Sequence, residues 1–424
     1  MPMRNVLLAV VALTALVGGA GWYVVQKLLP PASVPAVADP AQAELAARFL
    51  DLLDARRYDE ALAMATPRVQ EGLAGGKLAE IWETLPKQLG ERKARSAVRG
   101  ESVNGKPIIA ATLSFAMLPL DARITFDSER RIAGFWIVPA KSTSAAAAEP
   151  ERGEGWHEVA TGVGQGADVL PATLTLPESG APFAAVVLVH GSGAHDRDET
   201  IGPNKPFRDL AHGLATRGIA VLRYEKRSKQ QPQRYAGAAY TVDDETTNDA
   251  LAAVAMLRTR ADVDPKRVFV AGHSLGALVA PRIGARDPAI AGLILLAGPA
   301  APLADTVVRQ SRYLLQQDGK NAAEIDAALA PIEAQRDAVR RIDASTPADA
   351  PSLLGLPAAY WRDLAGYDPV ATSRTLAQPM LVLQGGRDYQ VTVADDFSRW
   401  REAFPADPRV QLREYPTLGH TFIP

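Results

Sequence analysis

The stretch that decides the fold is residues 267–283, which read RVFVAGHSLGALVAPRI. Its first five residues are typical of a short buried strand, and residues 277–283 are typical of a helix packed closely against that strand. Between them, Gly272-His273-Ser274-Leu275-Gly276 matches the G-x-S-x-G pattern, which places a serine on a tight turn from strand to helix. The glycines are expected because the turn strains the serine backbone and leaves no room for a Cβ. The pattern predicts that Ser274 is a nucleophile for acyl transfer to water, the alternative being a loop serine that matches by chance.

A serine hydroxyl is a weak nucleophile, so the pattern also predicts a base and an acid, in the chain order Ser, Asp or Glu, His. The chain has six histidines, and only His420 follows Ser274. It lies in the loop 415–420, directly after the strand-like residues 410–414. A single histidine is more often a surface or core residue, but this order and context predict that His420 is the base.

The acid is expected just beyond the preceding strand. Residues 379–385 form an apolar run of strand length that leads to Asp388. We predict that Asp388 orients His420 and stabilises its imidazolium without taking the proton itself. Asp395, Asp396 and Glu402 also precede His420, but they lie on a predicted helix at 393–404 and are interpreted as its solvated face.

The oxyanion of the tetrahedral intermediate needs two backbone N–H donors. Leu275, the residue after the nucleophile, supplies the first. For the second, the buried strand predicted at 184–189 ends in His190-Gly191-Ser192-Gly193, and Ser192 N–H is the best candidate. Gly191 and Gly193 allow that backbone to approach a substrate, and His190 is interpreted as a residue that positions the loop.

Several longer motifs carry a family resemblance. They are His190–Gly193, Asp196–Thr200, Gly202–Phe207, Arg223-Tyr224, Gly272–Gly276 and Asp388–Val391. On these, the stretch from about Trp156 to Pro424 resembles the bacterial α/β-hydrolases of the EstD-type carboxylesterase group. The resemblance implies hydrolysis of carboxylic esters with short acyl chains, no metal or organic cofactor, and Ser274, Asp388 and His420 as the catalytic triad.

The predicted fold of residues 156–424 is an α/β-hydrolase with a mostly parallel sheet and helices on both faces, because strand and helix patterns alternate. Residues 299–378 are predicted to form a helical insertion that caps the serine, or else a helical hairpin away from it. Its helical segments are expected at 305–317, 322–330, 332–342 and 357–367. Weaker candidates for substrate binding are His273, Trp361 and Tyr389.

Charge and composition limit the possible partners. The net charge is −2, so nothing points to nucleic acid, and the absence of cysteine excludes disulfides and thiolate metal sites. The charged run 195–199 lacks a second, spaced histidine and is expected to form ion pairs rather than a metal site. The predicted partner is the small-molecule ester that the resemblance implies, and the oligomeric state stays open.

Residues before the hydrolase suggest export and a second domain. Residues 1–38 contain an uncharged apolar segment and a Pro-rich exit, which predicts a signal peptide or a membrane anchor. We therefore expect a periplasmic or otherwise extracytoplasmic protein, which is attached to the inner membrane if the segment is an anchor. Residues 39–139 show helical spacing and then strand alternation at 108–115, 121–127 and 132–138, which predicts a small α+β domain. This part resembles the uncharacterised domain, of nuclear-transport-factor-like or cystatin-like type, that precedes related hydrolases. Residues 140–155 are expected to be a flexible linker.

Two other functions fit the same residues. A serine peptidase or amidase would use the same triad, and a non-catalytic binding protein on this fold would normally lack a member of the triad, which this chain does not. The chain stops four residues after His420, where the resemblance implies a closing helix, so we expect weaker support for the loop of the base and reduced turnover.

Overall fold

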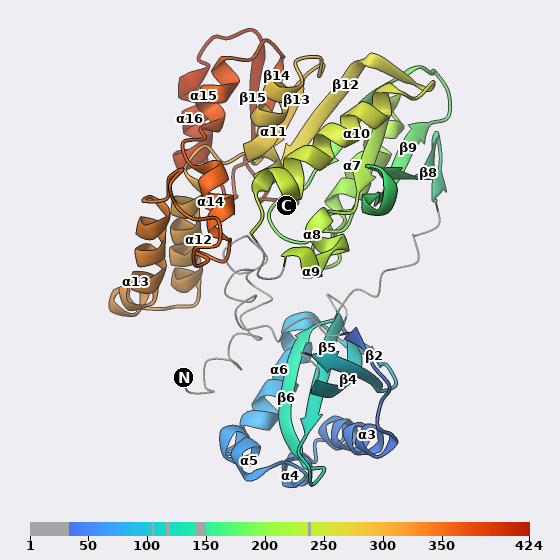
Figure 1. The fold of residues 1–424 in the computed structure, drawn as a ribbon, viewed down its shortest axis with the longest axis vertical. Coiled ribbons are helices and arrows are strands. Elements are labelled where there is room, and N and C mark those ends of the chain that lie inside the picture. The colour runs from blue at the N-terminus through green and yellow to red at the C-terminus, as the bar shows by residue number, and fades with distance from the viewer. Residues whose placement is uncertain (1–33, 104–105, 116–118, 141–149, 236–238) are drawn as a thin grey trace. The chain divides into compact units, whose positions relative to one another are not determined.

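The computed structural model describes residues 34–103, 106–115, 119–140, 150–235 and 239–424 (Figure 1). The described chain forms two compact units, one within residues 34–140 and one within residues 150–424. The predicted export segment lies almost entirely outside the described residues, as does most of the predicted linker. Among the described residues, no helix combines the length and hydrophobicity that a membrane span requires.

The first unit is a small α+β domain. After the short strand β1, four helices follow and pack on one face of an antiparallel sheet with the strand order β1-β3-β4-β5-β6, while β2 also pairs with β4. Pairs such as Ile109 with Ile124 and Ala111 with Ala122 alternate along β4 and β5, which turns one face of the sheet toward the helices. The elements are α3 (Pro40–Asp54), α4 (Tyr58–Ala63), α5 (Pro67–Leu73), α6 (Lys77–Leu89), β1 (Val34–Pro35), β2 (Arg92–Arg95), β3 (Arg99–Val103), β4 (Lys106–Phe115), β5 (Pro119–Phe126) and β6 (Ile132–Pro139).

The second unit is built on a nine-stranded sheet with the order β15-β14-β13-β12-β10-β11-β9-β8-β7. The six strands from β15 to β11 are parallel, and β9, β8 and β7 continue the sheet in antiparallel fashion. Their bounds are β7 (Arg152–Gly153), β8 (Trp156–Val163), β9 (Leu170–Pro177), β10 (Phe183–Val189), β11 (Ile219–Tyr224), β12 (Val263–His273), β13 (Leu293–Leu296), β14 (Met380–Gly385) and β15 (Val410–Tyr415).

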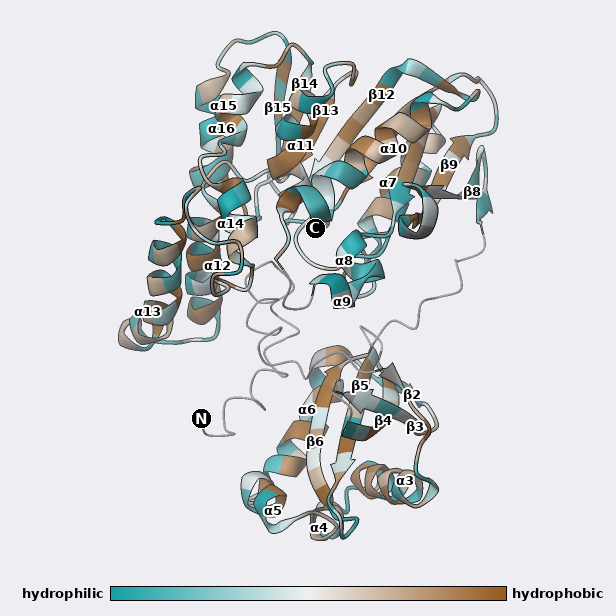
Figure 2. Cartoon of the chain, viewed as in Figure 1, coloured by the Kyte–Doolittle hydropathy of each residue, from teal (hydrophilic) through white to brown (hydrophobic). Residues whose placement is uncertain are grey.

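Helices cover both faces of this sheet. Along β10, Ala185 and Val187 face the core under α10 (Asn248–Arg258) and α11 (Leu275–Arg286), whereas Val186 and Leu188 face α7 (Pro206–Ala215). Alternate residues of a strand point to opposite faces, so one apolar run serves both layers. Hydrophobic residues accordingly concentrate in the strands and on the inner sides of the helices (Figure 2).

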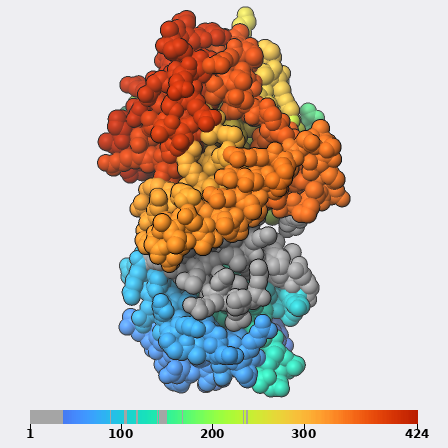
Figure 3. Space-filling view, turned by 90° about the vertical axis from the view of Figure 1, so that its left-hand side faces the viewer, coloured from blue at the N-terminus to red at the C-terminus, as the bar shows by residue number. Residues whose placement is uncertain are grey.

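The predicted helical insertion lies between β13 and β14. It contains α12 (Leu303–Gln317), α13 (Ala322–Val339), α14 (Ala358–Leu364) and α15 (Pro369–Arg374). The expectation of two helices at 322–330 and 332–342 is wrong: α13 is a single helix that includes Pro331. The insertion (orange) and the C-terminal segments of the same unit (red) form a continuous surface in Figure 3. The predicted fold class, an α/β-hydrolase with a helical insertion and a small α+β domain, is confirmed.

Three short helices and two wider turns also belong to the second unit. The helices α8 (Arg227–Gln230) and α9 (Pro232–Tyr235) follow β11, and α16 (Ser398–Ala403) precedes β15. The helix α10 follows a π-helical turn at Asp243–Thr247, and the helix predicted at 393–404 begins with one at Val393–Phe397. Such turns often occur near functional sites, and the second one lies close to the loop that carries Asp388.

Candidate active site

Ser274 occupies the turn between β12 and α11. Its backbone has φ of 51° and ψ of −112°, a strained combination for any residue other than glycine. The turn is held from both sides, because Ser274 N donates to Leu296 O at 2.9 Å and Ser274 O accepts from Leu278 N at 2.9 Å. The local sequence thus fixes the serine between a buried strand and a buried helix.

Gly272 and Gly276, which flank the serine, lie where any Cβ would overlap neighbouring backbone atoms. A Cβ on Gly276 would lie 2.1 Å from Val189 O, and a Cβ on Gly272 would lie 2.2 Å from the carbonyl carbon of Gly276. Both contacts are far inside van der Waals range and involve backbone atoms, which cannot move independently. The strand-to-helix turn at Ser274 therefore requires glycine at both positions.

Asp388 and His420 lie in direct contact after β14 and β15. His420 Nδ1 is 2.7 Å from Asp388 Oδ2. The other carboxylate oxygen of Asp388 accepts from Gln390 N at 2.8 Å and Val391 N at 2.9 Å, and the side chain is buried. A carboxylate held in this way fixes Nδ1 of His420 as the protonated nitrogen, which leaves Nε2 available for proton transfer.

The loop of His420 packs backbone to backbone against the loop of Asp388. A Cβ on Gly385 would lie 2.4 Å from Gly419 O, and Arg387 N donates to Leu418 O at 3.0 Å. Beyond the histidine, Gly419 N donates to Ile423 O at 2.9 Å. These contacts support the loop that carries the predicted base.

The predicted nucleophile lies at the same end of the sheet as the acid and the base. Since β12 to β15 are neighbouring parallel strands, the segments that follow them meet at one edge, where such sheets bind ligands. His273, next to Ser274, donates from Nε2 to His420 O at 3.0 Å. Within the described residues the Ser274 hydroxyl makes no hydrogen bond, so Ser274 and His420 are not directly bonded. Catalytic hydrogen bonds of free enzymes are often long and tighten only with substrate.

The two predicted oxyanion donors lie on either side of the serine. Leu275 is the first residue of α11, where a backbone N–H has no acceptor inside the helix. Gly191 lies against the elbow, since a Cβ on it would be 3.3 Å from Ser274 Cβ. In the described part of the chain, the N–H of the next residue, Ser192, makes no hydrogen bond. Gly193 has φ of 103°, which continues this loop through a conformation that favours glycine.

Glu199 joins the elbow to the loop after β10. The residue is 1% exposed and has φ of 50°. Its Oε1 accepts from Gly191 N at 2.6 Å, and its Oε2 lies 2.9 Å from His273 Nδ1 in an ion pair whose angle is outside hydrogen-bond geometry. Burial opposes ionisation, but the positive charge of His273 and the nearby histidines 195 and 190 hold the pKa of Glu199 at about 2.

The contact that lowers the pKa of Glu199 raises the pKa of His273. Burial lowers its pKa, but the charge of Glu199, the carbonyl of His420 and the charge of Asp388 together raise it above the ordinary value. A carbonyl only accepts, so Nε2 must carry a proton, and a carboxylate beside Nδ1 favours a second one. These contacts favour the protonated form of His273, which lies between Glu199 and the backbone of His420.

His190 is a buried neutral ring. It is 1% exposed and packs between Phe207 and Tyr224, with ring centroids 5.2 Å away in both cases. Burial is the main reason that its pKa falls to about 3. The ring therefore stays neutral near neutral pH and takes no part in proton transfer there.

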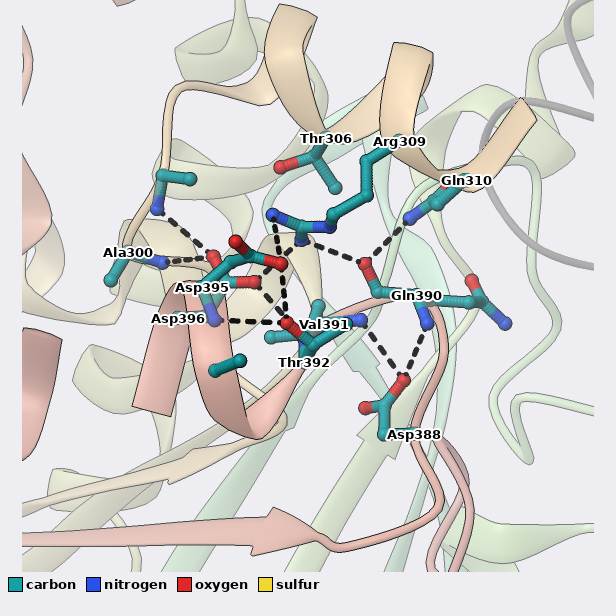
Figure 4. Close-up of polar contacts among 12 residues, drawn as sticks. Ala300, Thr306, Arg309, Gln310, Asp388, Gln390, Val391, Thr392, Asp395 and Asp396 are labelled. Carbon is teal, nitrogen blue, oxygen red and sulfur yellow. Dashed lines mark hydrogen bonds and ion pairs between the residues drawn. The ribbon is translucent and has the colours of Figure 1, made fainter. Parts of the chain in front are cut away.

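The insertion is fastened to the loop of Asp388 (Figure 4). From α12, Arg309 and Gln310 both donate to Gln390 O, at 3.2 and 3.1 Å. Arg309 also bonds Asp396 at 2.5 Å, and Asp396 accepts from Ala300 N at 3.0 Å. The interpretation of Asp396 as part of a solvated helix face is wrong, because its side chain is fully buried. The apolar Val393, Phe397 and Trp400, at helical spacing from it, were the signal that this face is internal.

The weaker candidates have ordinary surroundings. Trp361 is buried in the apolar cluster of the insertion, and its Nε1 donates to Leu353 O at 2.7 Å. Tyr389 stacks on Tyr313 with ring centroids 4.6 Å apart. In the charged run, Arg197 pairs with Glu225 at 2.9 Å and Asp198 bonds Arg223.

Comparison with known proteins identifies families for both units. The chain matches the Alpha/beta hydrolase family over residues 186–424 and a Protein of unknown function (DUF3887) over residues 46–135. It is 36% identical to Esterase EstD of Thermotoga maritima over 375 residues, which is 88% of this chain and 86% of that protein. The predicted resemblance to the EstD-type group is therefore confirmed.

Solved structures are more distant. Est1E from Butyrivibrio proteoclasticus is 18% identical, with 62% of this chain and 90% of that chain covered and a TM-score of 0.42. A putative dienelactone hydrolase from Klebsiella pneumoniae is 16% identical, with 63% and 88% covered and a TM-score of 0.38. Because both TM-scores are below 0.5, only the sequence matches show the family of this chain. On the match over residues 186–424 and the identity to Esterase EstD, the chain belongs to the alpha/beta hydrolase family.

Proposed function

We propose that this protein is a serine carboxylesterase that hydrolyses carboxylic esters through an acyl-enzyme. The observation that supports this most is the 2.7 Å contact between His420 Nδ1 and Asp388 Oδ2, at the sheet edge where the strained Ser274 turn also lies. The 36% identity to Esterase EstD supports the choice of ester over other acyl compounds. Hydrolysis needs only water in addition to these groups, so the proposal involves no cofactor.

In the first half-reaction, Ser274 Oγ adds to the ester carbonyl carbon as its proton passes to Nε2 of His420. Asp388 stabilises the imidazolium that forms. The negative oxygen of the tetrahedral intermediate accepts from Ser192 N–H and Leu275 N–H. The intermediate then expels the alcohol, which takes the proton from His420 and leaves the acyl group on Ser274.

The second half-reaction repeats these roles with water. His420 takes a proton from water as it adds to the acyl carbonyl carbon, and the same two N–H groups bind the oxyanion. Collapse of this intermediate breaks the bond to Ser274 Oγ, which regains its proton from His420. The products are a carboxylic acid and the free enzyme.

Kinetics on nitrophenyl esters from acetyl to palmitoyl test the function and the chain-length preference. We expect the highest kcat/KM with short acyl groups, and a loss of about 10⁴-fold or more in Ser274→Ala. A fluorophosphonate should label the wild type and leave Ser274→Ala unlabelled. Hydrolysis that persists unchanged in the variant would exclude this mechanism.

An anilide with the same acyl group as the best ester separates esterase from amidase. We expect a much larger kcat/KM for the ester. Comparable values for both substrates would instead identify the protein as an amidase on the same triad, and an inert wild type would favour a binding protein.

We further propose that residues 1–38 direct export to the periplasm, where they are cleaved or serve as an anchor. The uncharged apolar segment and the Pro-rich residues that follow it support this. Cell fractionation of the full chain and of a version without residues 1–38 tests it. Esterase activity in the periplasmic or membrane fraction is expected only for the full chain, and cytoplasmic activity for both would contradict export.

A further inference from the structure

The loop after β10 is held by two buried charges of opposite sign. Glu199 Oε1 accepts from Gly191 N at 2.6 Å, and Lys226 Nζ donates to Gly191 O at 2.7 Å. Both side chains belong to residues that are 1% exposed. Burial of a charge is costly unless its contacts compensate, and neither charge is needed for the proton transfers of the triad. Their shared contact is one residue of the loop beside Ser274.

Lys226 itself is anchored firmly. Its Nζ lies 3.5 Å from Glu245, which is also buried, and its backbone N donates to His195 O at 3.1 Å. The ammonium is thus fixed from the segment after β11 and from the π-helical turn before α10. Contacts with Gly191, Glu245 and His195 therefore fix the position of Lys226.

Peptide geometry links this lysine to the predicted oxyanion donor. Gly191 C=O and Ser192 N–H belong to the same planar, trans peptide group, so the two bonds point in opposite directions. When Lys226 fixes the carbonyl, it also fixes the direction of Ser192 N–H. The following carbonyl, Ser192 O, is held by His195 Nε2 at 2.7 Å. In the described chain Ser192 N–H has no acceptor, although both carbonyls around it are bonded.

The lysine also changes the strength of this donor. A cation at a carbonyl oxygen polarises the amide and makes its N–H a better hydrogen-bond donor, and the effect is larger where water is excluded. An oxyanion hole works by having such donors oriented before charge develops. A fixed and polarised peptide is suited to that task.

We propose that Lys226 is a positioning residue for the oxyanion hole, which holds and polarises the Gly191–Ser192 peptide while Glu199 holds the N–H before it. This proposal rests on the proposed ester hydrolysis by Ser274. It assigns a role to two buried charged side chains, Lys226 and Glu199, that the triad does not use. Lys226 acts through Ser192 N–H and does not touch the substrate.

Lys226→Met tests the proposal, because methionine retains an unbranched chain and lacks the charge. Stabilisation of the oxyanion matters in the transition state and not in ground-state binding. We expect kcat to fall about 10- to 100-fold with KM within about twofold of the wild type, somewhat less than the loss of a donor itself. Affinity for a trifluoromethyl ketone with the same acyl group, which forms a tetrahedral oxyanion adduct on the serine, should fall in parallel with kcat/KM.

Two further lysine variants make the result specific. Lys229→Met, a half-buried position on helix α8, whose N-cap is Lys226, should leave kcat, KM and ketone affinity unchanged. Lys226→Arg keeps the cation and should recover part of the lost kcat. If Lys226→Met does not fold, Lys226→Arg is compared directly with the wild type, and lower kcat with a parallel loss of ketone affinity is then expected.

Several outcomes would overturn the proposal. A folded Lys226→Met protein with kcat and ketone affinity within twofold of the wild type would do so, as would a loss of kcat with unchanged ketone affinity. Failure of the proposed function is recognised separately, because then the wild type itself shows no hydrolysis that depends on Ser274. A wild type active through Ser274 with an unaffected Lys226→Met variant leaves the esterase intact and removes only the role of the lysine.

Discussion

At the scale of single residues, the site depends on backbone conformations that most side chains avoid. Ser274 and Glu199 both have positive φ, 51° and 50°, although neither is glycine. Such conformations cost on the order of 1–3 kcal/mol each and persist only where the surroundings enforce them. Here both residues lie against Gly191. The Cβ of Ser274 packs beside it, and Glu199 accepts a hydrogen bond from its N–H. The strain is concentrated where the reacting groups must be oriented.

Gly276→Ala tests how tightly this region is packed. The new Cβ would lie 2.1 Å from Val189 O, so either β10 or α11 must shift. We expect a loss of about 1–3 kcal/mol or more in the free energy of unfolding and a large fall in kcat, measured by urea denaturation and an ester assay.

Gly213→Ala is the matched control for that substitution. Gly213 lies within α7, and its nearest neighbour would be the flexible Arg217 Nη1 at 3.9 Å, so alanine should be neutral or stabilising by up to about 1 kcal/mol. Equal stability of the two variants would contradict the packing argument.

Some site residues could be predicted from the sequence and others could not, for a physical reason. Ser274, Asp388 and His420 could be proposed because each follows a strand-like run and because their order along the chain is restricted. Glu199 and Lys226 could not be, since their roles depend on a loop folding back onto a distant strand. Charged residues in a loop look solvated until the fold buries them.

At the scale of elements, the insertion helix α12 supports the acid of the triad. Arg309 and Gln310 bond Gln390 O, and Gln390 N in turn bonds Asp388. The segment after β14 is therefore fixed by a helix from the insertion as well as by the sheet. Sequence periodicity found the insertion helices, but it placed a break at Pro331 that α13 does not have. A proline removes one hydrogen bond, and the rest of an 18-residue helix compensates.

Asp396→Asn should loosen this support. The carboxylate accepts from Ala300 N, Ala301 N, Thr392 N and Arg309, and an amide has only one oxygen to offer. We expect a loss of about 2–4 kcal/mol in the free energy of unfolding, because buried donors lose their acceptor, together with a lower kcat.

Asp395→Asn provides the comparison for Asp396→Asn. Asp395 pairs with the same Arg309 at 3.5 Å, but its side chain is 51% exposed, so its loss should change stability by less than about 1 kcal/mol. Urea denaturation of both variants decides the question, and similar losses in both would show that burial of Asp396 is unimportant.

At the scale of the whole molecule, each unit has its own apolar core, and their sequence signals differ in strength. The parallel strands of the second unit are continuous apolar runs and were found with little error, as were the long strands of the first unit. The antiparallel strands β8 and β9 were missed because they mix polar and apolar residues, and Glu158 of β8 bonds Arg223 and His212. The alternation of polar and apolar residues along a short segment cannot show that its polar side chains form ion pairs with residues distant in the sequence.

Buried ionisable groups make the second unit sensitive to acid. His190 has a folded pKa of about 3 against an ordinary 6.5, so below pH 6.5 the unfolded chain binds a proton that the native protein refuses. Stability is therefore lost as the pH falls from 6.5 toward 3. Glu199 adds to the loss between its ordinary pKa of 4.5 and its folded pKa of about 2. His273, whose pKa is raised, stays protonated through this range and does not offset the loss.

His190→Asn should flatten this dependence. We expect the free energy of unfolding of the wild type to fall by up to about 1.4 kcal/mol per pH unit more steeply than that of the variant between pH 6.5 and about 4. Urea denaturation across that range measures the slopes. Parallel curves for the wild type and His190→Asn would disprove the assignment.

The order of the parallel strands has a consequence for how activity is acquired. The three predicted triad residues follow β12, β14 and β15, which belong to the four neighbouring strands β12 to β15 of the sheet, although β12 is distant from the other two along the polypeptide. Contacts of such long sequence separation form slowly during folding. Ester hydrolysis should therefore return during refolding only after β15 has paired with β14. The time course of esterase activity during renaturation then measures how fast this strand joins the sheet.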